Sequence, residues 1–506
     1  MFILCSICAS TDFAIVDETT AFALLRCFFP SRRKDTACGT NERTSQPMSP
    51  SLPSIRPFIA WALAALAMVL ALIAPALWNG FPIVYYDTGG YLMRPFDGTL
   101  DIGRSALYGG FLALGIPFDF WPNAIAQAAL VAWLVALTFR AHGFGAKPGL
   151  VATIVGLALF TGLPWYVSQL IPDILVAAAV LALALLAFHN AQLRRWEKPL
   201  LGAVTAFSIA SHMAILALTL GLLVAFALMR LLASRLALPR AALAWPALAI
   251  AAGLLLAPFS NFLIAGRFAF TPGGTNFVFA RLVQDGIVSR YLTDRCPDPS
   301  IALCAFRDDV ATRSANDWLW DENSPLAKLG GFDAFAPTAQ RIARDTLLAY
   351  PGLHVRTAAQ AALGQFASFT TGDEIVPWTW HAEWVLERFA PATLPRFLAS
   401  RQRTPIDLTP LNFIQVPIAA LAIAALLVLA TVARRRITAP AAALTLTVLI
   451  ALVGNAAICG VLSNPQARYQ GRLVWLAPLA VVIALSGWRR QLAPTSKAKP
   501  KAKKII

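Results

Sequence analysis

Apolar runs of about 15–25 residues recur along this chain, and an α-helix needs this length to cross the hydrocarbon core of a bilayer. Of the 506 residues, 58% are hydrophobic and only 13% are charged. A soluble domain cannot bury so much apolar surface, because a single core stops growing at roughly 250–300 residues. The sequence therefore predicts an all-α polytopic membrane protein with about ten transmembrane helices.

Residues 199–229 form an apolar run that is either one long helix or two short ones. Arg194 and Arg230 lie in basic connectors on either side of it. Basic connectors face the cytoplasm, so an even number of crossings must separate them. This predicts two short spans with a turn near Ser211 and His212. The ten predicted spans are then 57–77, 121–139, 150–163, 174–188, two within 199–229, 241–265, 411–433, 440–462 and 473–487.

The net charge of +16 follows the predicted topology. Residues 266–410 carry 14 basic and 15 acidic residues, so the positive excess lies mostly in short connectors between apolar runs. This positive-inside pattern explains the basic balance better than a nucleic-acid partner, which we do not expect. We predict a multi-pass bacterial inner-membrane protein with both termini in the cytoplasm and with 266–410 as a mostly helical extracytoplasmic insert.

The chain extends beyond the predicted spans at both ends. Residues 1–56 are predicted to form a disordered cytoplasmic leader. Met48 begins a short polar lead into the first apolar run, so residues 1–47 are either part of that leader or the product of a mis-assigned start. Residues 489–506 are predicted to form a basic cytoplasmic tail.

Two cysteines lie close together in the predicted insert. Cys296 and Cys304 have seven residues between them. In an oxidising compartment they are candidates for a small disulfide loop, and the alternative is a pair of free thiols.

Ionisable residues are absent from the ten predicted spans and gather on their extracytoplasmic side. Asp87 lies in the first outer loop, residues 78–120, within the sequence YYDTGGYL that also contains Tyr91. The two glycines allow a tight turn that presents the carboxylate at the interface, where it can act as a general base. Alternatively, Asp followed by Thr-Gly-Gly is an ordinary turn or helix cap.

A second carboxylate follows in the sequence SQLIPDIL. Asp173 comes directly after Pro172 at the entry to the fourth predicted span. An acidic residue beside a proline is a common helix start. The functional alternative is a second carboxylate that faces Asp87 and binds a sugar hydroxyl or a metal.

A pair of arginines marks the last outer loop, NPQARYQGRLVWL. Arg468 and Arg472 lie one helical turn apart, on the side of the membrane where arginines are disfavoured. Guanidinium groups suit phosphate oxygens, so the pair predicts an anion site, with interfacial snorkelling as the alternative. Arg104 and His212 fall on the same side, and each either joins a phosphate site or is structural.

With these motifs in place, the chain resembles the GT-C superfamily of membrane glycosyltransferases. The resemblance rests on YYDTGGYL, SQLIPD and ARYQGR and covers roughly residues 57–265 and 411–487. It looks closest to uncharacterised bacterial members near the dolichyl-phosphate-mannose mannosyltransferase and lipopolysaccharide sugar transferase branches. The resemblance implies a GT-C-like fold, Asp87 as the catalytic base and Arg468 with Arg472 at the phosphate of a polyprenyl-phosphate sugar.

We therefore expect a glycosyltransferase that moves a sugar from a polyprenyl-phosphate donor to an extracytoplasmic glycan or lipid acceptor, with Tyr91, Arg104, Asp173 and His212 also binding substrate. The main alternative is a non-enzymatic component of polysaccharide or lipid assembly or translocation. Spans without charge argue against ion-coupled transport. An acyl- or phosphoethanolamine transferase is a third alternative, although the five histidines form no metal-ligand cluster in the sequence. Whether a divalent metal takes part stays open.

Overall fold

The computed structural model describes residues 56–100, 102–145, 147–270, 273–373, 375–377 and 379–492. The predicted leader up to residue 55 and the tail beyond residue 492 lie outside these ranges. Within them the chain is helical, and the only β-bridge joins Ile83 to Gln169.

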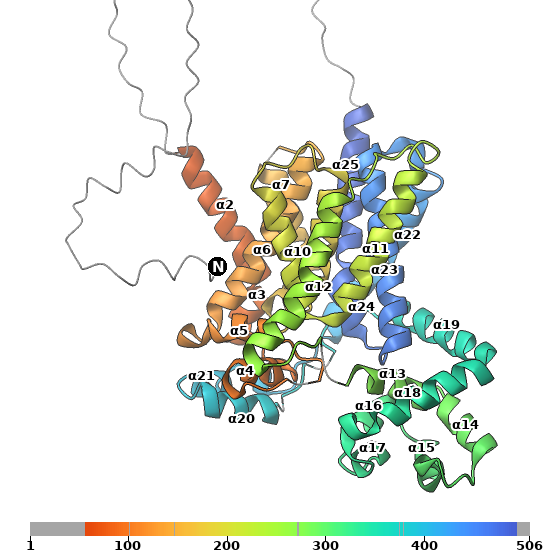
Figure 1. The fold of residues 1–506 in the computed structure, drawn as a ribbon. Helices are drawn as coiled ribbons and strands as arrows, with labels where there is room; N and C mark the ends of the chain where they lie inside the picture. Colours follow the sequence, from red (N-terminus) through yellow and green to blue (C-terminus); the bar gives the residue numbers. More distant parts are fainter. Residues whose placement is uncertain are drawn as a thin grey trace, which may run out of the picture. The chain divides into compact units, whose positions relative to one another are not determined.

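Six helical segments in the described part of the chain are long and apolar enough to cross a membrane, and three shorter helices are also apolar. By the length and composition of these helices, the chain is a helical membrane protein (Figure 1). The long segments are α6 (Trp121–Ala141), α11 (Met213–Leu231), α12 (Ala244–Ala265), α22 (Thr409–Ala430), α23 (Ala439–Leu462) and Ala467–Arg490, which joins α24 (Ala467–Val474) to most of α25 (Leu476–Leu492). The shorter ones belong to α2 (Arg56–Leu72), α7 (Lys147–Phe160) and α9 (Ile174–Phe188).

Helix breaks within the apolar runs have local causes. The first predicted span divides into α2 and α3 (Ala74–Asn79), because Pro75 lacks the N–H that would continue the helix. The predicted break near His212 is confirmed: α10 (Glu197–Ser211) ends there and α11 begins at Met213. His212 has an extended backbone, and its ring accepts a hydrogen bond from the N–H of Ala214. The break therefore leaves the imidazole beside the ends of both helices.

Helix α9 lies at the centre of the helix packing. Every residue from Ile174 to Phe188 is buried, and α9 contacts α6, α10, α11, α12 and α23. A helix that is apolar on all sides can be buried on all sides without enclosing an unpaired polar side chain. Burial of α9 fixes its first residue, and with it the preceding Asp173, in the interior of the protein.

The connection from α12 to α22 is mostly helical, as predicted for the insert. Its first part has a core of its own, formed around Phe279, Trp318 and Phe335. Its later helices contact the spans: α19 packs on α23, and α20 packs on α4 (Thr88–Asp97) of the first outer loop. The helices are α13 (Gly274–Gln284), α14 (Ile287–Arg295), η3 (Ala302–Phe306), α15 (Arg307–Val310), α16 (Ala315–Trp320), α17 (Pro325–Lys328), α18 (Gly331–Ala349), α19 (Pro351–Ala367), α20 (Trp380–Phe389), α21 (Leu394–Leu398) and η4 (Arg401–Arg403).

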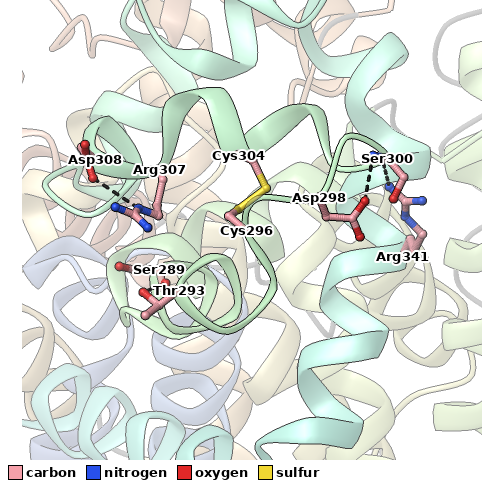
Figure 2. Close-up of a disulfide and its surroundings, with 9 residues drawn as sticks. All are labelled: Ser289, Thr293, Cys296, Asp298, Ser300, Cys304, Arg307, Asp308 and Arg341. Atoms are coloured by element: carbon pink, nitrogen blue, oxygen red, sulfur yellow. Dashed lines mark hydrogen bonds and ion pairs between the residues drawn. A yellow bond between two sulfur atoms is a disulfide. The ribbon is translucent and has the colours of Figure 1, made fainter.

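A disulfide joins Cys296 to Cys304 in this connection (Figure 2). The loop between them is held at Ser300, whose N–H donates to the Asp298 carboxylate at 2.8 Å. The carbonyl oxygen of Ser300 accepts a hydrogen bond from Arg341 of α18 at 3.5 Å. The disulfide loop is therefore tied to the core of the insert rather than extending from it.

Candidate functional site

A short backbone pairing brings the first two sequence motifs together. The N–H of Ile83 donates to the carbonyl oxygen of Ser168, and the N–H of Leu170 donates to the carbonyl oxygen of Ile83, both at 2.9 Å. The hydroxyl of Thr88 donates to the carbonyl oxygen of Leu170 at 3.2 Å. The first outer loop is thus fixed along the loop that leads into α9, and the two aspartates that follow these segments lie near each other.

Both aspartates occupy the residue before a helix, but neither carboxylate caps its own helix. Asp87 precedes α4 and Asp173 precedes α9, and neither side chain accepts a hydrogen bond from the first turn. The helix-cap alternative therefore explains the position of each residue but not the direction of its side chain. Each carboxylate instead contacts arginines from other parts of the chain.

Five side chains of alternating charge form what we call the rim network: Arg104, Asp87, Arg468, Asp173 and Arg472. Arg104 Nη2 lies 2.5 Å from Asp87 Oδ1, and Arg468 Nη2 lies 3.5 Å from Asp87 Oδ2. Arg468 Nη1 is 4.0 Å from Asp173 Oδ2, and Arg472 Nη1 is 2.6 Å from Asp173 Oδ1. Three guanidiniums and two carboxylates give the network a net positive charge.

Burial changes along the rim network. The side chains of Arg472 and Asp173 are 0% and 2% exposed, whereas those of Arg468, Asp87 and Arg104 are 13%, 13% and 18% exposed. The deep end is therefore a buried ion pair, and the other three charges lie close enough to the surface to meet a ligand. Aromatic rings flank the shared arginine, whose Cζ lies 4.7 Å from the Tyr85 ring centroid.

The deep ion pair is not fully satisfied by hydrogen bonds. Among the described residues, Asp173 Oδ2 and Arg472 Nε have no hydrogen-bond partner. Burial alone would raise the pKa of the Asp173 carboxyl, but the guanidiniums of Arg472 and Arg468 bring that pKa below its ordinary value. Asp173 is therefore an anion, and its free oxygen faces the more exposed Arg468.

His212 and Tyr91 adjoin the rim network without a direct ion pair to it. His212 Nδ1 accepts the Ala214 N–H, so Nε2 carries the ring proton. Burial and the charge of Arg472 lower the pKa of His212 to about 3, so the ring is neutral at pH 7. Tyr91 is buried against Tyr108, with ring centroids 5.3 Å apart, and burial raises the pKa of its hydroxyl.

A shallow hollow with a cavity volume of about 30 Å³ lies beside Arg104. Its polar lining includes Arg104, His212 and Asn261, and its apolar lining includes Leu216 and Phe270. The hydroxyl of Ser105 donates to the carbonyl oxygen of Ala210 at 2.7 Å, which holds the first outer loop against the end of α10. The mixed lining suits a ligand with hydroxyl groups and C–H surfaces.

The structure adds neighbours of the site that the sequence motifs do not identify. Asp373 of the insert accepts a hydrogen bond from the N–H of Arg468 at 3.4 Å. Gln402 bonds both the N–H and the carbonyl oxygen of Val84, at 2.9 and 2.8 Å, and so fixes the segment that leads to Asp87. Tyr166 directs its hydroxyl toward Gly471. Their sequence signal is weak because each lies in a loop or a short helix with no repeated pattern.

The residues present do not fit a protein-bound divalent metal. The described part of the chain contains no group of three or more His, Cys, Asp or Glu side chains that could hold a metal ion. Asp87 and Asp173 are also the only carboxylates of the rim network, and both face guanidiniums that would repel a cation. We therefore assign no role to a metal.

Comparisons with known proteins place the chain in no family. No protein-family model matches it. No curated protein and no solved structure matches it either. The proposed function therefore rests on the residues of the site and their geometry.

Proposed function

We propose that this protein is a GT-C-like glycosyltransferase that moves a sugar from a polyprenyl-phosphate donor to a glycan or lipid acceptor at the extracytoplasmic face of the bacterial inner membrane. One observation carries the proposal: Asp87 lies between Arg104 and Arg468, at 2.5 and 3.5 Å, beside an open hollow. This arrangement places a candidate general base in contact with two candidate anion-binding side chains. The six long apolar segments and three shorter apolar helices coincide with nine of the ten predicted spans, and the remaining one, within 199–229, falls in α10.

Arg468 is the best candidate for contact with the donor phosphate. It is shared between two carboxylates at 3.5 and 4.0 Å, which are loose ion pairs, so a phosphate can compete for its guanidinium. Arg472 is 0% exposed and bound to Asp173 at 2.6 Å, so its part in the proposal is to hold Asp173 in place. Arg104 is the second candidate, because its side chain also reaches the hollow.

Asp87 would act as the base once the phosphate draws these arginines away from its oxygens. The acceptor hydroxyl gives its proton to the Asp87 carboxylate while its oxygen bonds to the anomeric carbon of the sugar. The bond from that carbon to the phosphate oxygen breaks, and polyprenyl phosphate leaves with the electron pair. Arg468 would stabilise the charge that develops on the leaving group.

In the proposal, the neutral ring of His212 positions the sugar. Its Nε2–H can donate to a sugar hydroxyl without adding charge to the site. Asp173 is 2% exposed, so its part in the proposal is indirect: its second oxygen faces Arg468 at 4.0 Å and would help to place that guanidinium beside Asp87. Tyr91, buried below the network, would support the turn that presents Asp87.

The test replaces Asp87 by Asn in the full chain and measures lipid-linked sugars by mass spectrometry in a deletion strain. We expect product formation to fall about 100- to 10,000-fold, because the amide cannot accept the proton. Asp97→Asn is the matched control, since Asp97 belongs to the same helix and pairs with Arg94 rather than with the rim network. Undiminished product from a folded Asp87→Asn protein would rule out the assigned base and favour a non-enzymatic role.

A further inference from the structure

Three aromatic side chains of the insert form a cluster that we call the aromatic platform. Trp320 of α16 lies 6.2 Å from Phe277 of α13 and 5.7 Å from Phe332 of α18, measured between ring centroids. Trp320 is 51% exposed, although the neighbouring Trp318 is fully buried in the core of the insert. One face of this indole is therefore free for a ligand, while its two ring neighbours hold it in place.

The aromatic platform lies directly against the first outer loop. A Cβ atom added to Gly103 would come 3.8 Å from the Phe277 ring. One added to Gly273 would come 3.1 Å from both Ile102 and Phe332. The loop that supplies Arg104 is thus in van der Waals contact with the insert.

Gly103 connects the aromatic platform to the hollow of the rim network. It lines the hollow together with Arg104 and His212, and Arg104 binds Asp87 Oδ1 on its other side at 2.5 Å. A chain of packing contacts therefore links Trp320, through Phe277, to Gly103 beside Arg104.

The surroundings of Trp320 match a saccharide better than a hydrocarbon chain. A pyranose ring has C–H faces that pack on an indole and hydroxyls that bond to planar polar groups. Asn316 and Asp321 flank Trp320 in the sequence, and the Asp321 carboxylate is 39% exposed and fixed by Arg313 at 2.7 Å. The exposed aliphatic side chains Leu347 and Leu348 belong instead to the far end of α18.

We infer that the aromatic platform is a saccharide-binding subsite, where one pyranose ring of a glycan acceptor packs on Trp320 and another part of the glycan extends past Gly103 toward Asp87. The acceptor role rests on the proposed function, whereas binding of a saccharide by Trp320 does not. The inference selects a glycan, rather than a lipid, as the acceptor class.

Binding is measured with the purified full-length protein on an array of defined bacterial oligosaccharides, with soluble oligosaccharide as competitor. We expect Trp320→Ala to weaken binding of the glycans that the wild type retains by about tenfold. Trp320→Phe, which keeps a smaller ring, should fall in between. Trp196→Ala is the matched control, because Trp196 is 49% exposed, much as Trp320 is. Trp196 directly precedes α10, and it is the other end of α10 that adjoins the hollow.

The outcomes separate this inference from the proposed function. Absence of binding to every printed glycan by the wild type, or equal binding by wild type and Trp320→Ala, overturns the subsite. If Trp320→Ala does not fold, Trp320→Gln repeats the test, with thermal unfolding as the check. Asp87→Asn should keep binding while it loses product. If Asp87→Asn keeps its product and Trp320→Ala loses binding, the subsite stands and the transferase proposal fails.

Discussion

Two ionic clusters, near opposite ends of α10, differ in how completely their charges are satisfied. Glu197 begins α10 and is 2% exposed, and it accepts hydrogen bonds from both Nη atoms of Arg140, at 2.8 and 2.5 Å. The N–H of Arg194 adds a third bond at 2.8 Å. Both oxygens of Glu197 are therefore occupied by groups of the protein, and we call this cluster the closed pair.

The rim network, which adjoins His212 at the other end of α10, has no such closure. The contacts of Arg468 to its two aspartates are long, at 3.5 and 4.0 Å, and among the described residues Asp173 Oδ2 accepts no hydrogen bond. Buried charges cost free energy unless they are paired and hydrogen-bonded. A saturated pair such as that of Glu197 needs only a structural explanation. An arginine shared between two carboxylates at 3.5 and 4.0 Å can instead exchange one of these long contacts for an anionic ligand.

The largest expected effect comes from removing the deep carboxylate of the rim network. Asp173→Asn leaves the fully buried Arg472 without a counter-charge, so the free energy of unfolding should fall by about 3–5 kcal/mol. Denaturant unfolding in mixed micelles measures the change. A variant as stable as the wild type would mean that Asp173 does not neutralise Arg472.

A second variant separates stability from function at the same position. Asp173→Leu combined with Arg472→Met removes both charges and should recover most of the lost stability. Product formation should stay low, because the carboxylate that helps to place Arg468 beside Asp87 is absent. Recovery of product together with stability would show that the deep pair is only structural, like the closed pair.

The next effect concerns the arginine shared by both aspartates. Arg468→Lys keeps the charge but loses the planar fork that spans Asp87 and Asp173, so product formation should fall about 100-fold. Arg140→Lys is the matched change in the closed pair and should leave product per folded molecule unchanged. If both variants lost product formation equally, the rim network and the closed pair would not differ in function.

A smaller effect is expected from the closed pair itself. Glu197→Gln keeps the shape of the side chain but weakens its bonds to Arg140, so the free energy of unfolding should fall by about 1–3 kcal/mol. Lipid-linked product, normalised to folded protein, should equal that of the wild type. A selective loss of product would instead give this end of α10 a part in the reaction.

Sequence patterns predicted which segments of this protein are helical more accurately than they predicted where each helix begins and ends. The apolar runs locate α6, α9, α11, α12, α22 and α23, and the positive-inside argument locates the break at His212. The last predicted span is preceded by α24, which extends the apolar helical segment back to Ala467 and includes Arg468 and Arg472. Those arginines are accommodated by buried aspartates and tyrosine rings, which no local pattern reveals.

The candidate site was predictable only in its charged members. Four charged residues are recognisable because each lies next to an apolar run, where a charged side chain is costly and usually has a function. They are Asp87, Asp173, Arg468 and Arg472. Their mutual contacts depend on residues far apart in the sequence. Gln402, for example, holds Val84 from 318 positions away. The aromatic platform was missed for the same reason, since it forms only where α13, α16 and α18 meet.

The smallest expected effect is a pH dependence that both ends of α10 should show. Burial lowers the pKa of His212 and of His189 to about 3, whereas the unfolded chain binds these protons near pH 6.5. Between these values the unfolded state binds more protons, so stability should fall as pH decreases below about 6.5 and should be unaffected above pH 7.5.

Thermal unfolding between pH 5 and 7.5 tests this window, above the range where Asp173 titrates. His212→Gln and His189→Gln should each remove the contribution of one histidine to the pH dependence of the free energy of unfolding. Each contribution is less than about 1 kcal/mol at pH 6. The two contributions should add, because the residues lie in separate clusters. Donor phosphate near Arg468 would raise the pKa of His212 but not that of His189. Added polyprenyl phosphate should therefore flatten the pH dependence of the wild type and leave that of His212→Gln unchanged, and an equal change in both would place the phosphate elsewhere.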